Sequence, residues 1–326
     1  MNWKLKSLIR RSLTAAPGGH HLYRWLTSKA FGMQAGMATK WFRVIPNHVK
    51  VMQTHFGPQA REVSMWCFNC GATPAPAYAM AVVSDRPGLL TDQDNRMSGQ
   101  YLEVSKRLLA EKGPELAAQS SAPADRVASL LAKLPVSGDA HVVMKEIGMT
   151  YSSDHAIAME APWRGNIGLM FSTGNLEHFT PDELEKWMAM VKQAMRPDGV
   201  LSHVMDHRDH RWHADKTISP LLQYTLSEEQ FQQVMGNTLD YHNRWLRSDW
   251  VRFFESHGYT VETRTVIPNS PDLVQTDRKS LAPAYQGATD SDLASLVTHF
   301  VARRQTAPAP CAAHSQVHEK ITNPFY

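Results

Sequence analysis

Short apolar runs alternate with amphipathic stretches along most of this chain. The runs occupy residues 63–68, 88–91, 149–151, 167–172, 200–205, 261–266 and 296–302. Six have the length of a buried strand, whereas 149–151 is shorter and, with 141–147, is compatible with a mixture of helix and strand. Apolar residues at helical spacing fill many of the intervals between them. Alternating strands and helices predict an α/β fold, here a Rossmann-like, mostly parallel seven-stranded sheet with helices on both faces.

One segment carries especially clear boundaries of a βαβ unit. Thr180 is a good helix cap and Pro181 suits the first helical position, and apolar residues then follow at helical spacing. Pro-Asp-Gly at residues 197–199 ends this helix, and residues 200–205 return as a strand. The helix is long enough to be the crossover between two parallel strands.

The pattern divides the chain into three regions. Residues 1–58 are predicted to form an N-terminal helical extension that is interrupted by glycines. Residues 59–304 hold all the predicted strands and form the Rossmann domain. Residues 305–326 contain Ala, Pro and His without periodicity, so we expect a flexible C-terminal tail.

Composition places the chain among globular proteins. It has 326 residues, of which 43% are hydrophobic and 20% charged. Lys and Arg number 34 against 31 Asp and Glu, so the net charge is only +3. A nucleic-acid-binding protein usually concentrates basic residues on one face, and no internal basic run does so here. We therefore expect no nucleic-acid partner.

The lack of a long apolar run and the character of residues 1–13 predict a cytoplasmic protein. No apolar run approaches the roughly 20 residues that a membrane-spanning helix needs. Residues 1–13 are basic and amphipathic, without the continuous apolar centre of a signal peptide. We favour docking of this segment on the protein itself, with peripheral contact to an anionic membrane as the alternative. The oligomeric state stays open.

Polar residues follow the predicted strands in succession. They are Asn69 and Gly71 after the first strand, Asp92 after the second, Asp154 after the third and Asn175 after the fourth. Carboxyl ends of parallel strands share one edge of a sheet, where ligands bind. A glycine lets the backbone approach a ligand, and an acid after the second strand can hold a ribose diol. These five residues are the predicted contacts of a nucleoside-containing cofactor.

Two stretches here resemble a known family. Residues 169–179 (LMFSTGNLEHF) and 195–204 (MRPDGVLSHV), with the capped helix between them, are similar to the fourth strand, helix and fifth strand of class I S-adenosylmethionine-dependent methyltransferases. The continuations SHVMDHRDHRWHADKTISP, YHNRWLRSDW and FFESHGY resemble a bacterial branch linked to cell-surface polysaccharide or other glycoconjugate pathways. The resemblance implies S-adenosylmethionine as cofactor and methyl transfer to a small-molecule or glycan acceptor.

The first loop departs from the family pattern. Where the family usually has an acid and a glycine-rich loop, residues 66–74 read WCFNCGATP. Cys67 stands in the place of the acid, Asn69 and Thr73 stand where glycine is usual, and Gly71 is retained. Two functions therefore stay open: an active methyltransferase, or a methyltransferase-like scaffold or binding protein without catalysis. An N- or C-methyltransferase is a third option.

Transfer to a sugar hydroxyl would require a base, and histidine suits this task because its reference pKa is about 6.5. His178, after the fourth strand, is the first choice, and His203, His207 and His210 compete with it. If the fifth strand continues, odd-numbered residues from 203 share one face, and even-numbered residues from 202 to 210 share the other.

Further polar residues are candidates for contacts to the acceptor. They are Glu177, Asp206, Tyr241, Asn243, Arg244 and Arg247. An arginine pair recognises phosphate or carboxylate groups. A divalent metal held by Asp206, Asp209 and His210 is a second way to activate the acceptor. A charged structural network with Arg208, Lys216 and Arg244 is the favoured interpretation of the same three residues.

Overall fold

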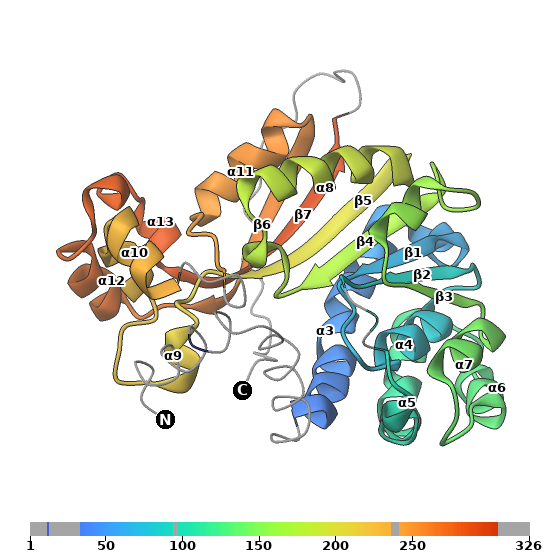
Figure 1. Cartoon of the computed structure of the whole chain (residues 1–326). Helices are drawn as coiled ribbons and strands as arrows, with labels where there is room; N and C mark the ends of the chain where they lie inside the picture. Colours follow the sequence, from blue (N-terminus) through green and yellow to red (C-terminus); the bar gives the residue numbers. More distant parts are fainter. Residues whose placement is uncertain (1–11, 13–32, 94, 96, 236–240, 306–326) are drawn as a thin grey trace.

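The computed structural model describes residues 12, 33–93, 95, 97–235 and 241–305, and its centre is one twisted seven-stranded sheet (Figure 1). The strands are β1 (Ser64–Phe68), β2 (Gly88–Thr91), β3 (Met149–Ser152), β4 (Ile167–Thr173), β5 (Met195–Asp206), β6 (Tyr259–Pro268) and β7 (Ser295–Arg304). Their order across the sheet is β3-β2-β1-β4-β5-β7-β6. The predicted α/β class and number of strands are confirmed.

The sheet is mixed because of its last strand. Neighbours from β3 through β5 pair in parallel. β7 lies between β5 and β6 and runs antiparallel to both. The prediction of a mostly parallel sheet is therefore correct, and the reversal of β7 is a feature that the apolar pattern does not specify.

Helices cover both faces of the sheet (Figure 1). They are α3 (Met33–Phe56), α4 (Ala75–Val83), α5 (Leu102–Gln119), α6 (Arg126–Lys133), α7 (Ala140–Glu146), α8 (Pro181–Ala194), α9 (Arg211–Ala214), α10 (Glu228–Met235), α11 (Arg247–Ser256), α12 (Pro271–Arg278) and α13 (Asp290–Leu293). Side chains alternate along the strands, so Cys67 packs in the core with α3 to α7 while Phe68 packs in the core with α8 and α11. Burial on both faces explains why the strands read as nearly continuous apolar runs.

The crossover helix begins as its sequence predicts. Thr180 Oγ1 accepts a hydrogen bond from the backbone N–H of Glu183, and the Glu183 carboxylate accepts one from the backbone N–H of Thr180. This reciprocal pair satisfies two N–H groups that the helix itself cannot use. The helix α8 then leads directly into β5, which brings the site residues after β4 and β5 to the same edge.

A smaller apolar cluster lies beyond the ends of β5, β6 and β7. It combines Leu221, Tyr224, Val274, Leu281 and Leu293 with the strand residues Val204 and Val297. Figure 1 shows α9, α10, α12 and α13 gathered at this end of the sheet. These helices stand beside the edge where the strand-end polar residues meet.

The N-terminal extension is described from residue 33 onward, apart from Ser12. Its helix α3 has residue contacts with α4, α5, β4 and β5, so it is part of the packed body. The amphipathic segment predicted at residues 1–13 and the tail predicted at 305–326 lie outside the described residues, except for Ser12 and Gln305. Within the described part, none of the helices combines the length and apolar character needed to span a bilayer.

Candidate active site

The strand order locates the ligand-binding edge. β1 has β2 on one side and β4 on the other, so the chain leaves β1 in one direction and later returns to it from the opposite one. Loops that follow two such strands diverge, and ligands bind beyond the carboxyl ends at this point. The loop after β1 carries Asn69 and Gly71, and the loop after β4 carries Asn175.

The ends of β1 and β2 are joined by a short hydrogen bond. The backbone N–H of Gly71 donates to Oδ2 of Asp92 at 2.7 Å, and Asp92 is only 4% exposed. Gly71 has a φ of 77°, in the left-handed region that glycine adopts without strain. The backbone N–H of Asp92 donates to the carbonyl of Ser152 at 3.1 Å, which ties in the end of β3. The predicted cofactor residues Gly71 and Asp92 therefore lie together.

Two asparagines shape the loop after β1. Asn69 has a φ of 53°, a conformation that asparagine tolerates better than most residues. Its Oδ1 is buried and has no hydrogen-bond partner in the described part of the chain. The amide nitrogen of Asn175 donates to the carbonyls of Asn69 and Thr173, each at 3.3 Å. Asn175 thus ties the loop after β1 to the end of β4.

The side chains of Phe68 and Thr73 point in different directions. Thr73 Oγ1 lies 3.0 Å from Ser105 Oγ and accepts from the N–H of Ala75, so it faces α5. The buried ring of Phe68 packs 4.4 Å, centroid to centroid, from the ring of His155 in the turn after β3. Thr73 thus turns toward α5, whereas Phe68 packs against the turn after β3.

Two other positions at this end have local roles. Asp154 is exposed, and its Oδ1 accepts from the backbone N–H of Ala156 at 2.8 Å, which caps the turn that starts at His155. Cys67 is fully buried, and burial together with the charge of Asp92 raises the pKa of its thiol well above the usual range. The sulfur at the position of the family's acid is therefore a neutral packing group.

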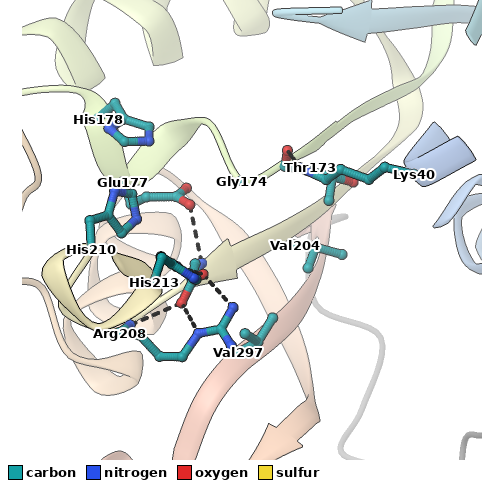
Figure 2. A pocket seen from close by; sticks show the side chains of 11 residues that line it. Lys40, Thr173, Gly174, Glu177, His178, Val204, Arg208, His210, His213 and Val297 are labelled. Carbon is teal, nitrogen blue, oxygen red and sulfur yellow. Dashed lines mark hydrogen bonds and ion pairs between the residues drawn. The ribbon is translucent and has the colours of Figure 1, made fainter. Parts of the chain in front are cut away.

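A cavity of about 270 Å³ opens beyond the ends of β4 and β5. Most of its lining residues have polar side chains, and they come from α3, β4, β5, α9, β7 and the loops after β4 and β5. The lining residues are Lys40, Thr173, Gly174, Glu177, His178, Val204, Asp206, Arg208, His210, His213 and Val297. Figure 2 shows His178, Glu177 and His210 on one side of this cavity and Lys40 with Thr173 on the other.

Alternation along β5 decides which histidines reach the cavity. Val204 and Asp206 line it from the even-numbered face of β5, and Arg208 and His210 line it from the segment after the strand, which ends at Asp206. His203 is fully buried on the opposite face, with its Nδ1 at 2.8 Å from Ser172 Oγ. Burial lowers its pKa to about 3. A catalytic role for His203 requires correction because the ring packs in the core.

His207 is also placed away from the cavity. It is 3% exposed, its Nε2 lies 3.1 Å from Thr298 Oγ1, and burial lowers its pKa to about 4. The ring packs near Phe300 at a centroid distance of 6.1 Å. Like His203, it lies in the core, so the catalytic role predicted for it is corrected too.

The orientation of His178 follows from one contact. Its Nδ1 lies 2.9 Å from the carbonyl oxygen of Tyr241. A carbonyl only accepts, so in this contact Nδ1 carries the proton and donates. In the neutral ring, Nε2 then keeps a free lone pair, and the ring lies at the cavity wall. This is the tautomer that a general base or a metal ligand requires.

Two carboxylates lie close together at the base of the cavity. Glu177 is 2% exposed, its Oε1 accepts from the backbone N–H of Asp206 at 3.3 Å, and its Oε2 has no hydrogen-bond partner among described residues. Burial and the neighbouring charge of Asp206 raise the pKa of Glu177 to about 8. Burial also acts to raise the pKa of Asp206, but hydrogen bonds from His213 and Arg208 outweigh it and hold that pKa well below its usual range.

Three residues of the wall that can carry a charge are absent from the predicted site. Arg208 donates to both oxygens of Asp206, at 2.8 and 2.6 Å, and His213 Nε2 lies 3.3 Å from Oδ2 of the same carboxylate. Lys40 reaches over from α3, and its ammonium donates to the carbonyl of Thr173 at 3.2 Å. The spacing of His213, three residues after His210, is a signal in the sequence. Nothing in the sequence connects Lys40 with residues 173–178.

The remaining predicted contacts brace the helices beside the site. Asp209 is 1% exposed and forms a buried ion pair with Arg211, so it does not face the cavity as the metal hypothesis required. Asn243 donates to the carbonyl of Phe179 at 3.1 Å, and Arg244 donates to the carbonyls of Gln223 and Leu226. Arg247 donates to Ser291 Oγ at 2.5 Å, and Tyr241 contributes its carbonyl to His178. The lining of the described cavity does not include Tyr241, Asn243, Arg244 or Arg247.

No protein-family model matches the sequence, and no curated protein matches it. Several solved structures resemble the fold at low sequence identity. One is a phosphoethanolamine N-methyltransferase 2 of Haemonchus contortus with S-adenosyl-L-methionine: 14% identity, TM-score 0.43, covering 80% of this chain and 52% of that one. The present chain thus spans about half the length of that enzyme.

Two further structures show the same level of likeness. The geranyl diphosphate C-methyltransferase of Streptomyces coelicolor has 9% identity and a TM-score of 0.41, covering 79% of this chain and 77% of that one. An S-adenosylmethionine-dependent methyltransferase of Mesorhizobium loti has 12% identity and a TM-score of 0.40, covering 80% and 98%.

Proposed function

We propose that this protein transfers a methyl group from S-adenosylmethionine to a polar acceptor held in the cavity beside β4 and β5. One observation carries the proposal. The imidazole of His178, with a free Nε2, lies at the cavity wall in the loop after β4, and this loop is next to the loop that carries Gly71, the partner of Asp92. Asn175 connects the two places, because its amide group binds carbonyls on both sides. A donor at the end of β1 and an acceptor in the cavity would therefore be neighbours.

The residues at the end of β1 fit a nucleoside-bearing cofactor. Asp92 presents a buried carboxylate at the end of the second strand, where such a group binds ribose hydroxyls in dinucleotide-binding sheets. The buried Oδ1 of Asn69 lacks a partner among the described residues and is available to accept from an ammonium or hydroxyl group. When bound, S-adenosylmethionine supplies a methyl carbon on a sulfonium sulfur, which leaves with the electrons of the broken bond.

The acceptor side supplies orientation and proton transfer. The carboxylate of Asp206 accepts hydrogen bonds from hydroxyl groups, and Glu177, which keeps its proton near neutral pH, can donate one as well as accept, so the two are suited to hold a polyhydroxylated molecule. Nε2 of His178 takes up the proton of the reacting hydroxyl, and the carbonyl of Tyr241 keeps the ring in the required tautomer. Holding both partners in line supplies the larger part of the rate. We propose a hydroxyl of a saccharide or surface-polymer precursor as the acceptor.

A second candidate function is a binding protein without catalysis. The observation that favours it is the loop after β1, where the ring of Phe68 and the side chain of Asn69 occupy space that a glycine-rich loop leaves open. Methyl transfer and simple binding differ in turnover, so one assay separates them.

The test is an assay with the full chain and isotopically labelled S-adenosylmethionine. The panel contains free saccharides, nucleotide-activated sugars and phosphorylated sugars, with amines as the contrasting class. Label in a hydroxyl-bearing product supports the proposal. Label only in amines would replace the hydroxyl by a nitrogen acceptor, and a lack of label with every member would favour the binding protein.

A further inference from the structure

Two histidines and a glutamate lie close together on one side of the cavity, and each has a lone pair that could bind a metal ion. The ligand atoms of Glu177, His178 and His210 all lie within 4.8 Å of one another (Figure 2). The rings of His178 and His210 are 4.8 Å apart, centroid to centroid. Three such groups from two different segments, the loop after β4 and the segment after β5, meet only in the folded chain.

Each of the three groups has a free position for a ligand. Oε2 of Glu177 is buried and finds no hydrogen-bond donor within the described part of the chain. Nδ1 of His178 donates to the carbonyl of Tyr241, and this backbone contact leaves Nε2 free, as is usual for metal-binding histidines. The ring of His210 packs against the rings of His178, His213 and His242, and its nitrogens form no hydrogen bond with another described residue.

We propose that Glu177, His178 and His210 bind a divalent transition-metal ion of the zinc type. Two imidazoles and one carboxylate, with a position left open, form the ligand set of many catalytic zinc sites. Nitrogen donors disfavour Mg²⁺ and Ca²⁺, which prefer oxygen. Tetrahedral bonds of about 2.0–2.1 Å would bring donor atoms to roughly 3.3 Å from one another, so the side chains would close in by up to about 1.5 Å.

A competing ligand set shares His210 but is less suited. Asp206, His210 and His213 also lie within 4.8 Å of one another. In that set, however, Arg208 already binds both oxygens of Asp206, and His213 contacts the same carboxylate. These contacts give Asp206 the partners that Glu177 Oε2 does not have. We therefore do not include Asp206 and His213 among the proposed metal ligands.

The ion would deepen the proposed function, on which this part of the inference rests. A hydroxyl bound at the open position would lose its proton more readily, because the ion lowers its pKa. The proton would then pass to solvent through the open side of the cavity, the oxygen–carbon bond would form, and the carbon–sulfur bond would break. His178 would hold the ion in place of the proton, so turnover depends on His178 in either case.

The experiment measures binding without any methyl donor or acceptor. Full-length protein is stripped with a chelator, and Zn²⁺ is titrated by calorimetry while Co²⁺ is followed by visible absorption. We expect saturable one-to-one binding. Glu177→Gln, His178→Ala and His210→Ala should each weaken it by about 100-fold or more, whereas His213→Ala should retain it within about tenfold.

The matched control is His141→Ala, because this histidine is exposed on α7, away from the cavity. It should bind both ions as the unaltered protein does. Thermal unfolding of the metal-free variants checks that each one folds. Lack of saturable binding, a loss confined to His213→Ala, or an equal loss in His141→Ala would overturn the proposal. Any of these outcomes leaves the methyl-transfer proposal standing, since the labelled-donor assay tests that separately.

Discussion

The two ends of the candidate site are built in different ways. At the ends of β1 and β2, the contacts are made mainly by backbone groups, with the N–H of Gly71 and the carboxylate of Asp92 at the centre. At the ends of β4 and β5, the cavity is lined by titratable side chains, and one of them, Lys40, comes from a distant helix. The first arrangement suits recognition of a fixed ligand, and the second suits binding and proton transfer to a reacting group. A substitution at one end should therefore leave the function of the other intact.

The largest expected effect comes from His178→Ala at the acceptor end. Loss of the imidazole should lower turnover by about 10²- to 10⁴-fold, the usual contribution of a positioned acid–base group. The affinity for S-adenosylhomocysteine should not change, because His178 contacts Tyr241 and not the loop after β1. Turnover with the best acceptor and calorimetry with S-adenosylhomocysteine give the two readings. Unchanged turnover would remove His178 from the mechanism.

The converse substitution is Asp92→Asn at the donor end. It removes the charge from the hydrogen bond with Gly71 and from the proposed ribose contact. We expect a loss of affinity for S-adenosylhomocysteine of about 10- to 100-fold. The metal affinity measured with Zn²⁺ should stay as it was. An equal loss of affinity for S-adenosylhomocysteine and for Zn²⁺ would mean that the two ends of the site are not independent.

A smaller effect is the pH dependence of the unfolding free energy that the raised pKa of Glu177 causes. Its pKa in the folded protein is about 8, above its ordinary value of 4.5, so the folded state binds its proton more tightly than the unfolded state. The stabilisation of the folded state by the Glu177 proton is fully present below about pH 4.5 and is lost as the pH rises toward 8. Relative to Glu177→Gln, the unaltered protein should lose about 2 kcal/mol of unfolding free energy between about pH 6 and pH 8.

Chemical denaturation of both proteins at several pH values measures this difference, and the comparison cancels groups that the two share. A constant difference across the range would mean that Glu177 keeps an ordinary pKa. Lys40→Met should enlarge the difference, because the ammonium of Lys40 lowers the pKa of Glu177.

The smallest expected effect comes from Thr73→Val. The hydroxyl contacts Ser105 and caps the N–H of Ala75, so its loss should cost about 0.5–1.5 kcal/mol of unfolding free energy. Because this side chain faces α5, the affinity for S-adenosylhomocysteine should be unchanged. A clear change in that affinity would show that residue 73 reaches the cofactor after all.

Much of the fold follows from local patterns in the sequence. Strands buried on both faces leave continuous apolar runs, and the predicted run at 88–91 coincides with β2 (Gly88–Thr91). The capping pair of Thr180 and Glu183 marks the start of α8. The alternation along β5 also separates His203 from Val204 and Asp206, because a strand has a fixed period of two, but it does not say which face lines the cavity.

Features that depend on tertiary packing were less predictable. Gly113 and Pro114 suggest a break, yet α5 (Leu102–Gln119) continues through them. A Cβ at Gly113 would lie 3.0 Å from side-chain atoms of Leu109 and Val127, so the glycine permits close packing of α5 against α6. Lys40 joins the cavity for a similar reason, since only the docking of α3 on the sheet brings it to Thr173.

Calorimetric titration of the full chain with S-adenosylhomocysteine tests the central claim most directly, since the claim is that the ends of β1 and β2 bind the methyl donor beside the acceptor cavity. We predict saturable one-to-one binding that weakens in Asp92→Asn and persists in His178→Ala. Absence of heat at millimolar ligand, or binding that is unaffected by Asp92→Asn and lost in His178→Ala, would contradict it.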